Sequence, residues 1–178
     1  MNQPGGKSPL QKMLGFLTVL EHDQHGLTGG YLLLTPTGRP LEFHCTAPVK
    51  PTRAQQILFG KTLGEFLYGE HIGQTLVAKG SATPAVVFTD VIPAMAVGQF
   101  VECPVVLVLS RSLQSTPEVA GLDAFPLGVN RLAVALHVSR ERVAAVLEGL
   151  DDFDCNEPFG RIREAIEEAQ RSTSAKAA

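Results

Sequence analysis

Long apolar runs are missing from this chain, since none reaches the roughly 18 residues that a membrane-spanning helix needs. The first eight residues also lack the apolar stretch of a secretory signal peptide. We therefore expect a cytoplasmic protein with no membrane partner.

Cysteines are few, and none of them is close to another. Cys45, Cys103 and Cys155 form no C-x-x-C pair, and their number is odd. This pattern excludes a disulfide framework and a cysteine-based zinc site. We expect three free thiols.

Neither sign of charge is in large excess. The formal net charge is −3, and 44% of the residues are hydrophobic against 19% charged. Such a chain has no overall attraction for phosphate backbones, so a nucleic-acid role would need a local basic patch. The composition is globular, and 178 residues fit one domain. We place that domain at residues 10–171, with flexible termini at 1–9 and 172–178.

The usual catalytic motifs are absent as well. The chain has no G-x-x-x-x-G-K-[ST] loop and no G-x-S-x-G elbow. Its Gly29-Gly30 pair runs into an apolar run typical of a strand instead of a helix start, so no helix dipole would face a phosphate there. We therefore assign no catalytic, cofactor-binding or metal-binding residue and expect no cofactor.

What the chain does contain is a clear β-hairpin pattern near its start. Apolar runs at 13–20, 31–35 and 40–46 are separated by polar turns, of which 35–40 is the strongest. In the third run Leu41, Phe43 and Cys45 alternate with Glu42 and His44. We expect Phe43 in the core and His44 at the surface.

A helical region follows the hairpin. Thr52 with Gln55, and Thr62 with Glu65, both match the capping-box pattern, and Gly69 suggests a break, so we expect two or three short helices. Strands are predicted at 85–89 and 105–109, irregular segments at 90–98 and 110–126, and closing helices at 129–150 and 158–171. These elements predict an α+β fold with a mainly antiparallel sheet, an N-terminal β-hairpin, helices packed largely on one face and two C-terminal helices.

Two polar clusters could carry chemistry. Imidazoles and carboxylates gather in the 21–25 loop and on the strand that follows the hairpin turn, a combination that suits zinc with one position left open: Glu21, His22, Asp23, His25, Glu42 and His44. The segment 152–156 begins like a calcium loop, but Glu157 stands where the loop needs glycine and Arg163 where it needs glutamate. An acidic connection between two helices explains that segment better.

Residues 131–147 carry the sharpest local pattern. Small Ala133 lies among the apolar Leu132, Leu136 and Val138, and Ser139 could cap a second helix. The segment resembles the helix-turn-helix motif of bacterial DNA-binding regulators, which implies that 140–142 would face the major groove. Its departure from the motif is His137, where the family usually has glycine. A single amphipathic helix over 129–150 explains the same apolar spacing.

By elimination, the favoured function is a small non-catalytic interaction or scaffold module. Its expected partner is another protein or a second copy of the chain, as in a homodimer, and we lean against an enzyme. The first alternative is a DNA-binding regulator that uses 130–147, with nucleic acid as partner. The second is a small enzyme with its site at the 21–25 loop and the Glu42 and His44 strand face.

Overall fold

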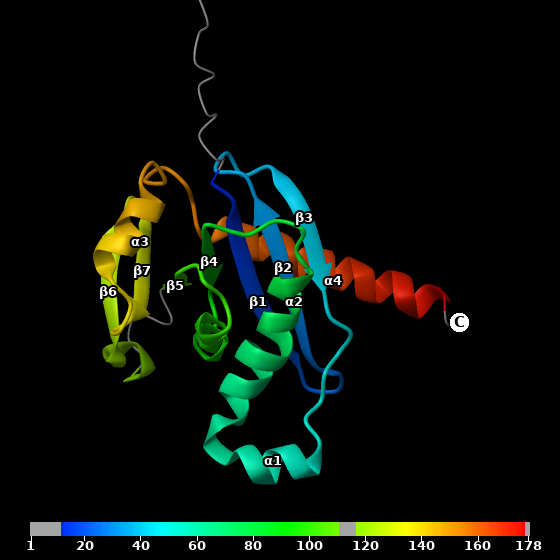
Figure 1. The fold of residues 1–178 in the computed structure, drawn as a ribbon. Helices are drawn as coiled ribbons and strands as arrows, with labels where there is room; N and C mark the ends of the chain where they lie inside the picture. The colour runs from blue at the N-terminus through cyan, green and yellow to red at the C-terminus, as the bar shows by residue number, and fades with distance from the viewer. Residues whose placement is uncertain (1–11, 111–116, 177–178) are drawn as a thin grey trace, which may run out of the picture.

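A seven-stranded mixed sheet forms the centre of the computed structural model, which describes residues 12–110 and 117–176 (Figure 1). The predicted flexible segment 1–9 and the last two residues of the predicted 172–178 tail lie outside these ranges. The strands stand in the order β3-β2-β1-β4-β5-β7-β6. Their bounds are β1 Leu14–His22, β2 Gly26–Leu34, β3 Pro40–Cys45, β4 Val86–Thr89, β5 Val105–Val108, β6 Leu122–Leu127 and β7 Asn130–Ala135.

The centre of the sheet is parallel and its flanks are antiparallel. β1 pairs parallel with β4, and β4 pairs parallel with β5. The β1-β2-β3 meander and the β5-β7-β6 side are antiparallel. The α+β class and the predicted hairpin, β2 with β3, are confirmed, but the mainly antiparallel sheet is corrected to a mixed one. Helical connections lead from β3 to β4 and from β4 to β5. A crossover of this kind returns the chain across the sheet, so the next strand can pair in parallel with its neighbour.

The predicted closing helix over 129–150 is wrong, and so is the first helix of the helix-turn-helix. The segment is the strand β7 followed by a turn and a short helix, α3 Arg140–Leu147. In β7 the consecutive residues Leu132, Ala133 and Val134 are all fully buried, as they would be in a strand covered on both faces. Ser139 does cap α3, because its hydroxyl accepts the backbone N–H of Arg142. The sequence from 110 to 126 also differs from the prediction, since it contains η5 Pro117–Gly121 and β6.

The helical region after β3 keeps its predicted start but not its predicted break. α1 Arg53–Phe59 begins with the complete Thr52 and Gln55 capping box and ends at Gly60, which has a φ of 51°. After η1 Gly60–Thr62, the π-helix η2 Glu65–Gln74 continues through Gly69 into α2 Thr75–Lys79. Gly69 is needed for close packing instead, because a Cβ there would meet the backbone N of Val97 in η3 at 2.9 Å.

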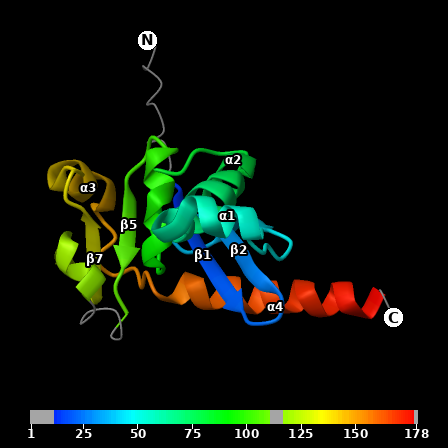
Figure 2. The same cartoon turned by 90° about the horizontal axis from the view of Figure 1, so that it is seen from below.

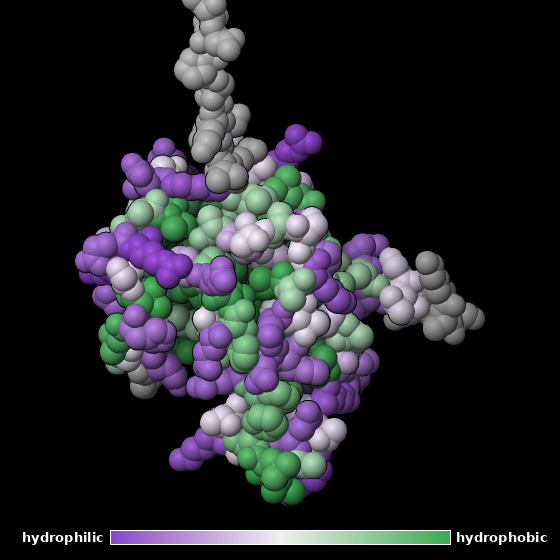
Figure 3. All heavy atoms as spheres, in the orientation of Figure 1, coloured by the Kyte–Doolittle hydropathy of each residue, from purple (hydrophilic) through white to green (hydrophobic). Residues whose placement is uncertain are grey.

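One short helix of this region carries no buried residue at all. α1 projects from the body of the protein, and its Ile57 and Leu58 side chains are 64% and 82% exposed. Figure 3 shows hydrophobic residues gathered at this projecting end. At its base the rings of Phe59 and Phe66 stack with centroids 4.0 Å apart.

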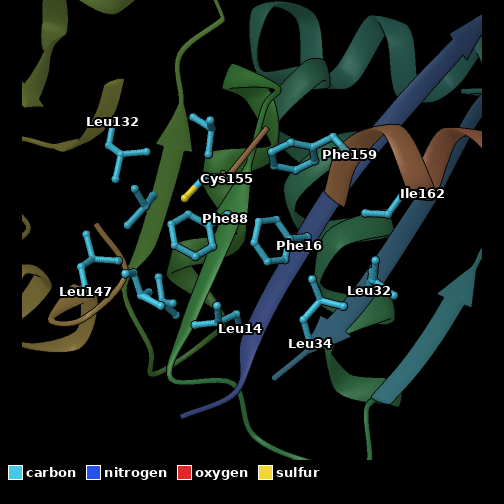
Figure 4. Packing of buried hydrophobic residues seen from close by; sticks show 14 of the residues in the cluster. Leu14, Phe16, Leu32, Leu34, Phe88, Leu132, Leu147, Cys155, Phe159 and Ile162 are labelled. Atoms are coloured by element: carbon cyan, nitrogen blue, oxygen red, sulfur yellow. The ribbon is translucent and has the colours of Figure 1, made fainter. Parts of the chain in front are cut away.

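Helices cover both faces of the sheet, which corrects the prediction that they pack largely on one. α4 Glu157–Lys176 lies on one side of β1 and β2, and α1 and α2 lie on the other (Figure 2). The 3-10 helix η3 Ile92–Gln99 packs on the same side as η2 and α2. On the α4 side, the Phe16 ring stacks on Phe88 at 4.9 Å and meets Phe159 edge-on at 5.5 Å (Figure 4). The helix predicted at 158–171 is confirmed, and it continues to Lys176.

Two neighbouring glycines in β2 show how tightly both faces are packed. A Cβ on Gly29 would collide with Ile72 of η2, and a Cβ on Gly30 would collide with Ile162 of α4. Because successive strand residues point to opposite faces, each glycine allows one helix to pack closely against its own face of the sheet.

The edge strand β3 departs from its predicted burial. Phe43 is 37% exposed and Leu41 is 46% exposed, so the prediction that Phe43 belongs to the core is wrong. α4 packs over β1 and β2, and the same face of β3 lies beyond it. His44, on the other face, is half-buried beside Glu42.

We predict that Gly29→Ala and Gly30→Ala each lower the free energy of unfolding by about 1–3 kcal/mol, because each overpacks one face. In urea titrations Gly29→Ala should couple favourably with Ile72→Ala, and Gly30→Ala with Ile162→Ala. The crossed pairs, Gly29→Ala with Ile162→Ala and Gly30→Ala with Ile72→Ala, serve as controls and should be additive. Coupling in the crossed pairs would contradict a two-faced sheet.

Candidate functional site

The histidines and carboxylates considered from the sequence do not converge. The His22 and His25 rings lie 4.6 Å apart at the β1-β2 turn. His44 is paired with Tyr31 in β2, five residues along the strand from Gly26 and therefore on the order of 17 Å from that turn. Within residues 12–110 and 117–176, no three His, Cys, Asp or Glu side chains gather to hold a metal ion.

Glu42 and His44 instead form a structural tie. His44 Nε2 lies 3.0 Å from Glu42 Oε2, and the backbone N–H of Ser81 donates to the same carboxylate at 2.9 Å. The hydrogen bonds from Ser81, with a smaller contribution from His44, lower the pKa of Glu42 to about 2. Because Ser81 follows α2 directly, the carboxylate joins the edge strand β3 to the end of that helix.

The 152–156 segment connects α3 to α4, and an asparagine holds it in place. Asn130 Nδ2 donates to the Phe153 carbonyl at 2.7 Å, and its Oδ1 accepts the backbone N–H of Cys155 at 2.9 Å. Asp154 accepts the N–H of Asn156 at the start of α4. These contacts account for the segment as a helix connection.

The residues expected to read DNA bind this chain's own groups. Arg140 pairs with Asp123 at 3.2 Å and lies over the Phe125 ring at 5.0 Å. Arg142 donates to the Glu102 carbonyl at 2.8 Å, and the Glu141 carboxylate accepts the Ser139 hydroxyl. These local contacts, and the strand β7 in place of a first helix, do not fit the expected helix-turn-helix.

The chain instead offers a candidate site, called the crevice below, at the point where the parallel ladder between β1 and β4 ends, and it consists of Thr18, Asp90 and Arg163. The strand order changes direction at this point, because β2 and β3 extend the sheet from one side of β1 and β4 and β5 from the other. In open sheets, ligands bind outside the carboxyl ends of parallel strands where the order reverses. Leu17 pairs with Thr89 at the end of this ladder, Thr18 follows within β1, and Asp90 directly follows the end of β4.

Two buried oxygens mark this crevice. Thr18 is fully buried, and neither its Oγ1 nor Asp90 Oδ1 has a hydrogen-bond partner among the described residues. The other Asp90 oxygen pairs with Arg163 of α4. The Asp90 side chain is 12% exposed, but that of Arg163 is 42% exposed, so its guanidinium still reaches solvent. Since buried polar groups are nearly always satisfied, the two oxygens point to a bound water or ligand.

A groove lies elsewhere, beside η3. It has a volume of about 730 Å³ and is lined by η3, the 101–104 loop, Lys61 and the start of α3.

Little in the sequence predicts the crevice. Asp90 is visible as an acid that follows a buried strand, but Arg163 was considered only as a mismatch in a calcium loop. The sequence around Thr18 predicts only a strand. The burial of Thr18 depends on α4, which is distant in the chain.

Several solved structures that the chain resembles are endonuclease V. Human endonuclease V is 16% identical and covers 90% of this chain and 86% of its own, with a TM-score of 0.48. Ciona intestinalis endonuclease V, in complex with a 23mer DNA containing an inosine followed by a ribo-adenosine, is 13% identical with a TM-score of 0.47 and covers 78% of this chain and 76% of its own. A scan against protein-family models finds no match, and neither does a search of curated proteins.

These matches correct the favoured prediction of a non-catalytic interaction or scaffold module and the lean against an enzyme. These structures are of an endonuclease, and two of them are complexes with DNA. At these identities and TM-scores the likeness transfers no residue role to this chain. In the described residues, no helix has the length and apolar character to cross a membrane.

We predict that the Glu42 tie makes stability depend on pH in the acid range. Its pKa is lowered by folding, so its contribution is complete above the unfolded value of about 4.3 and is lost as the pH falls towards about 2. In urea titrations Glu42→Gln should be less stable than the unsubstituted chain near neutral pH, and the gap should close below about pH 3. Glu164→Gln, on the exposed side of α4, should show no such gap at any pH. A gap for Glu42→Gln that does not change with pH would contradict the tie.

Proposed function

We propose that this chain binds nucleic acid in the crevice, where the parallel ladder between β1 and β4 ends. The observation that carries the proposal is the set of two partnerless buried oxygens, Thr18 Oγ1 and Asp90 Oδ1, beside the half-exposed guanidinium of Arg163.

The chemistry of the crevice supports a ligand with both kinds of hydrogen-bonding group. Asp90 Oδ1 can only accept when ionised, and the Thr18 hydroxyl can donate or accept. The remaining N–H groups of Arg163 suit a phosphate, which guanidinium binds in a forked geometry. A nucleic-acid strand presents phosphate oxygens together with sugar and base donors.

The charge of the chain sets the expected character of this binding. The net charge of −3 gives no overall attraction for a polyanion. Binding through one guanidinium is therefore local, and it should weaken steeply as salt rises. The ligand class is taken from the DNA in two of the similar structures, and the site from this chain's own residues.

The test is a fluorescence-anisotropy titration of labelled single-stranded and duplex DNA at several salt concentrations. We expect salt-sensitive binding, and we expect Arg163→Gln to weaken it and to reduce the salt slope by about 1, as for loss of one phosphate contact. The amide of Gln can still donate to Asp90. Arg171→Gln is the matched control, because Arg171 lies on the same helix but pairs only with the exposed Glu167 and Glu168.

A second variant separates binding from folding. Thr18→Val removes a buried hydroxyl that has no protein partner, so the free protein should not lose stability. If the hydroxyl contacts the ligand, the same change should weaken DNA binding. Binding that is absent at low salt, or that is indifferent to both Arg163→Gln and Thr18→Val, would contradict the proposal.

A further inference from the structure

The groove beside η3 has the size and composition of a small-molecule site. Its volume of about 730 Å³ falls in the range of ligand pockets, which are mostly apolar with a few polar groups. The apolar lining includes Ile92, Pro93 and Met95 of η3 and Val101 of the following loop. Neither Asp90 nor Arg163 lines it, so the groove is distinct from the crevice.

Arg142 is held in position at one wall of this groove. Its Nη2 donates to the Glu102 carbonyl at 2.8 Å, which leaves its other N–H groups available. The guanidinium also lies near the Cys103 thiol, where its charge opposes the rise in pKa that burial causes. Arginine N–H groups fixed in this way suit an oxyanion, since less side-chain entropy is lost on binding.

The other charged residues that line the groove form no ion pair with a described residue. Lys61 lines it from η1 and makes no ion pair with a described residue. The carboxylates of Glu65 and Glu102 also line it, and neither forms an ion pair with Lys61 or Arg142. The first turn of α3 adds its positive dipole end through Ser139, although Glu141 already offsets part of it.

We propose that this groove binds a small amphiphilic anion, an apolar ring or chain with one sulfonate, carboxylate or phosphate group. The anionic group lies against Arg142 and Lys61, and the apolar body lies on η3 and Val101. The site stands independently of nucleic-acid binding in the crevice.

The probes are 8-anilinonaphthalene-1-sulfonate and its neutral counterpart N-phenyl-1-naphthylamine, titrated by fluorescence against the full chain. We expect saturable binding of the sulfonate. Arg142→Gln should weaken sulfonate binding about tenfold, as for loss of a charge-assisted hydrogen bond, and should leave the neutral probe unchanged. Glu102→Gln should tighten sulfonate binding, because it removes a like charge.

Arg140→Gln is the matched control for charge. Arg140 neighbours Arg142 in the chain, but it pairs with Asp123 and does not line the groove, so its loss should leave both affinities unchanged. This comparison separates recognition at the groove from a general effect of net charge.

The native thiols report where the probe binds. Cys103 lines the groove and Cys45 does not, and both are partly exposed. The sulfonate should slow alkylation of Cys103 by N-ethylmaleimide, read by mass spectrometry, and leave the rate at Cys45 unchanged. No saturable binding, equal protection of the two thiols, or a sulfonate affinity indifferent to Arg142→Gln and Glu102→Gln would each overturn the proposal.

Discussion

The parallel pairing of β1 with β4 is the constraint on which the rest of the structure depends. Both strands are buried on both faces, and Phe16 and Phe88, in register, stack at 4.9 Å beneath α4. A strand buried on both faces needs a covering layer on each side. The chain supplies α4 for one layer and η2, α2 and η3 for the other. This arrangement requires glycine at positions 29 and 30, because a side chain at either position would hold a helix away from the sheet.

The same pairing produces the crevice. The ladder between β1 and β4 ends at Leu17 and Thr89, so Thr18 keeps its partner Gly30 in β2 but has no partner on the β4 side. The Thr89 hydroxyl accepts the N–H of Val91, which turns the chain towards η3 and leaves Asp90 facing α4. Arg163 then neutralises one carboxylate oxygen, and the second remains for a ligand.

Strong local patterns could be predicted from the sequence, and long-range pairing could not. The β2-β3 hairpin, the Thr52 capping box and the Phe159, Ile162 and Ile166 face of α4 each depend on residues a few positions apart, and each is present. The apolar pattern of 129–150 predicts a helix where β7 lies, because a strand that is buried on both faces shows no alternation of apolar and polar residues. Leu132 and Leu136 happen to stand at helical spacing, yet Leu136 is 74% exposed.

The candidate site was missed for a related reason. Arg163 and Asp90 are 73 residues apart, and only the fold brings their side chains together. Nothing in the neighbourhood of either residue distinguishes a buried ion pair from two surface charges. Phe43 shows the opposite error, because strict alternation identifies the apolar face of β3 but not whether a helix is long or wide enough to cover it.

The two ligand sites differ in how they depend on the sheet. The crevice is made by the central strands β1 and β4 together with Arg163 of α4. The groove is lined mainly by η3, the 101–104 loop and the start of α3, and Arg142 joins that loop to α3 through the Glu102 carbonyl. Side chains of the loop and of the α3 start lie outside the sheet, and specificity commonly resides in loops on a fixed scaffold. On this physical ground, substitutions in the 101–104 loop and at the start of α3 should change ligand preference at little cost to stability.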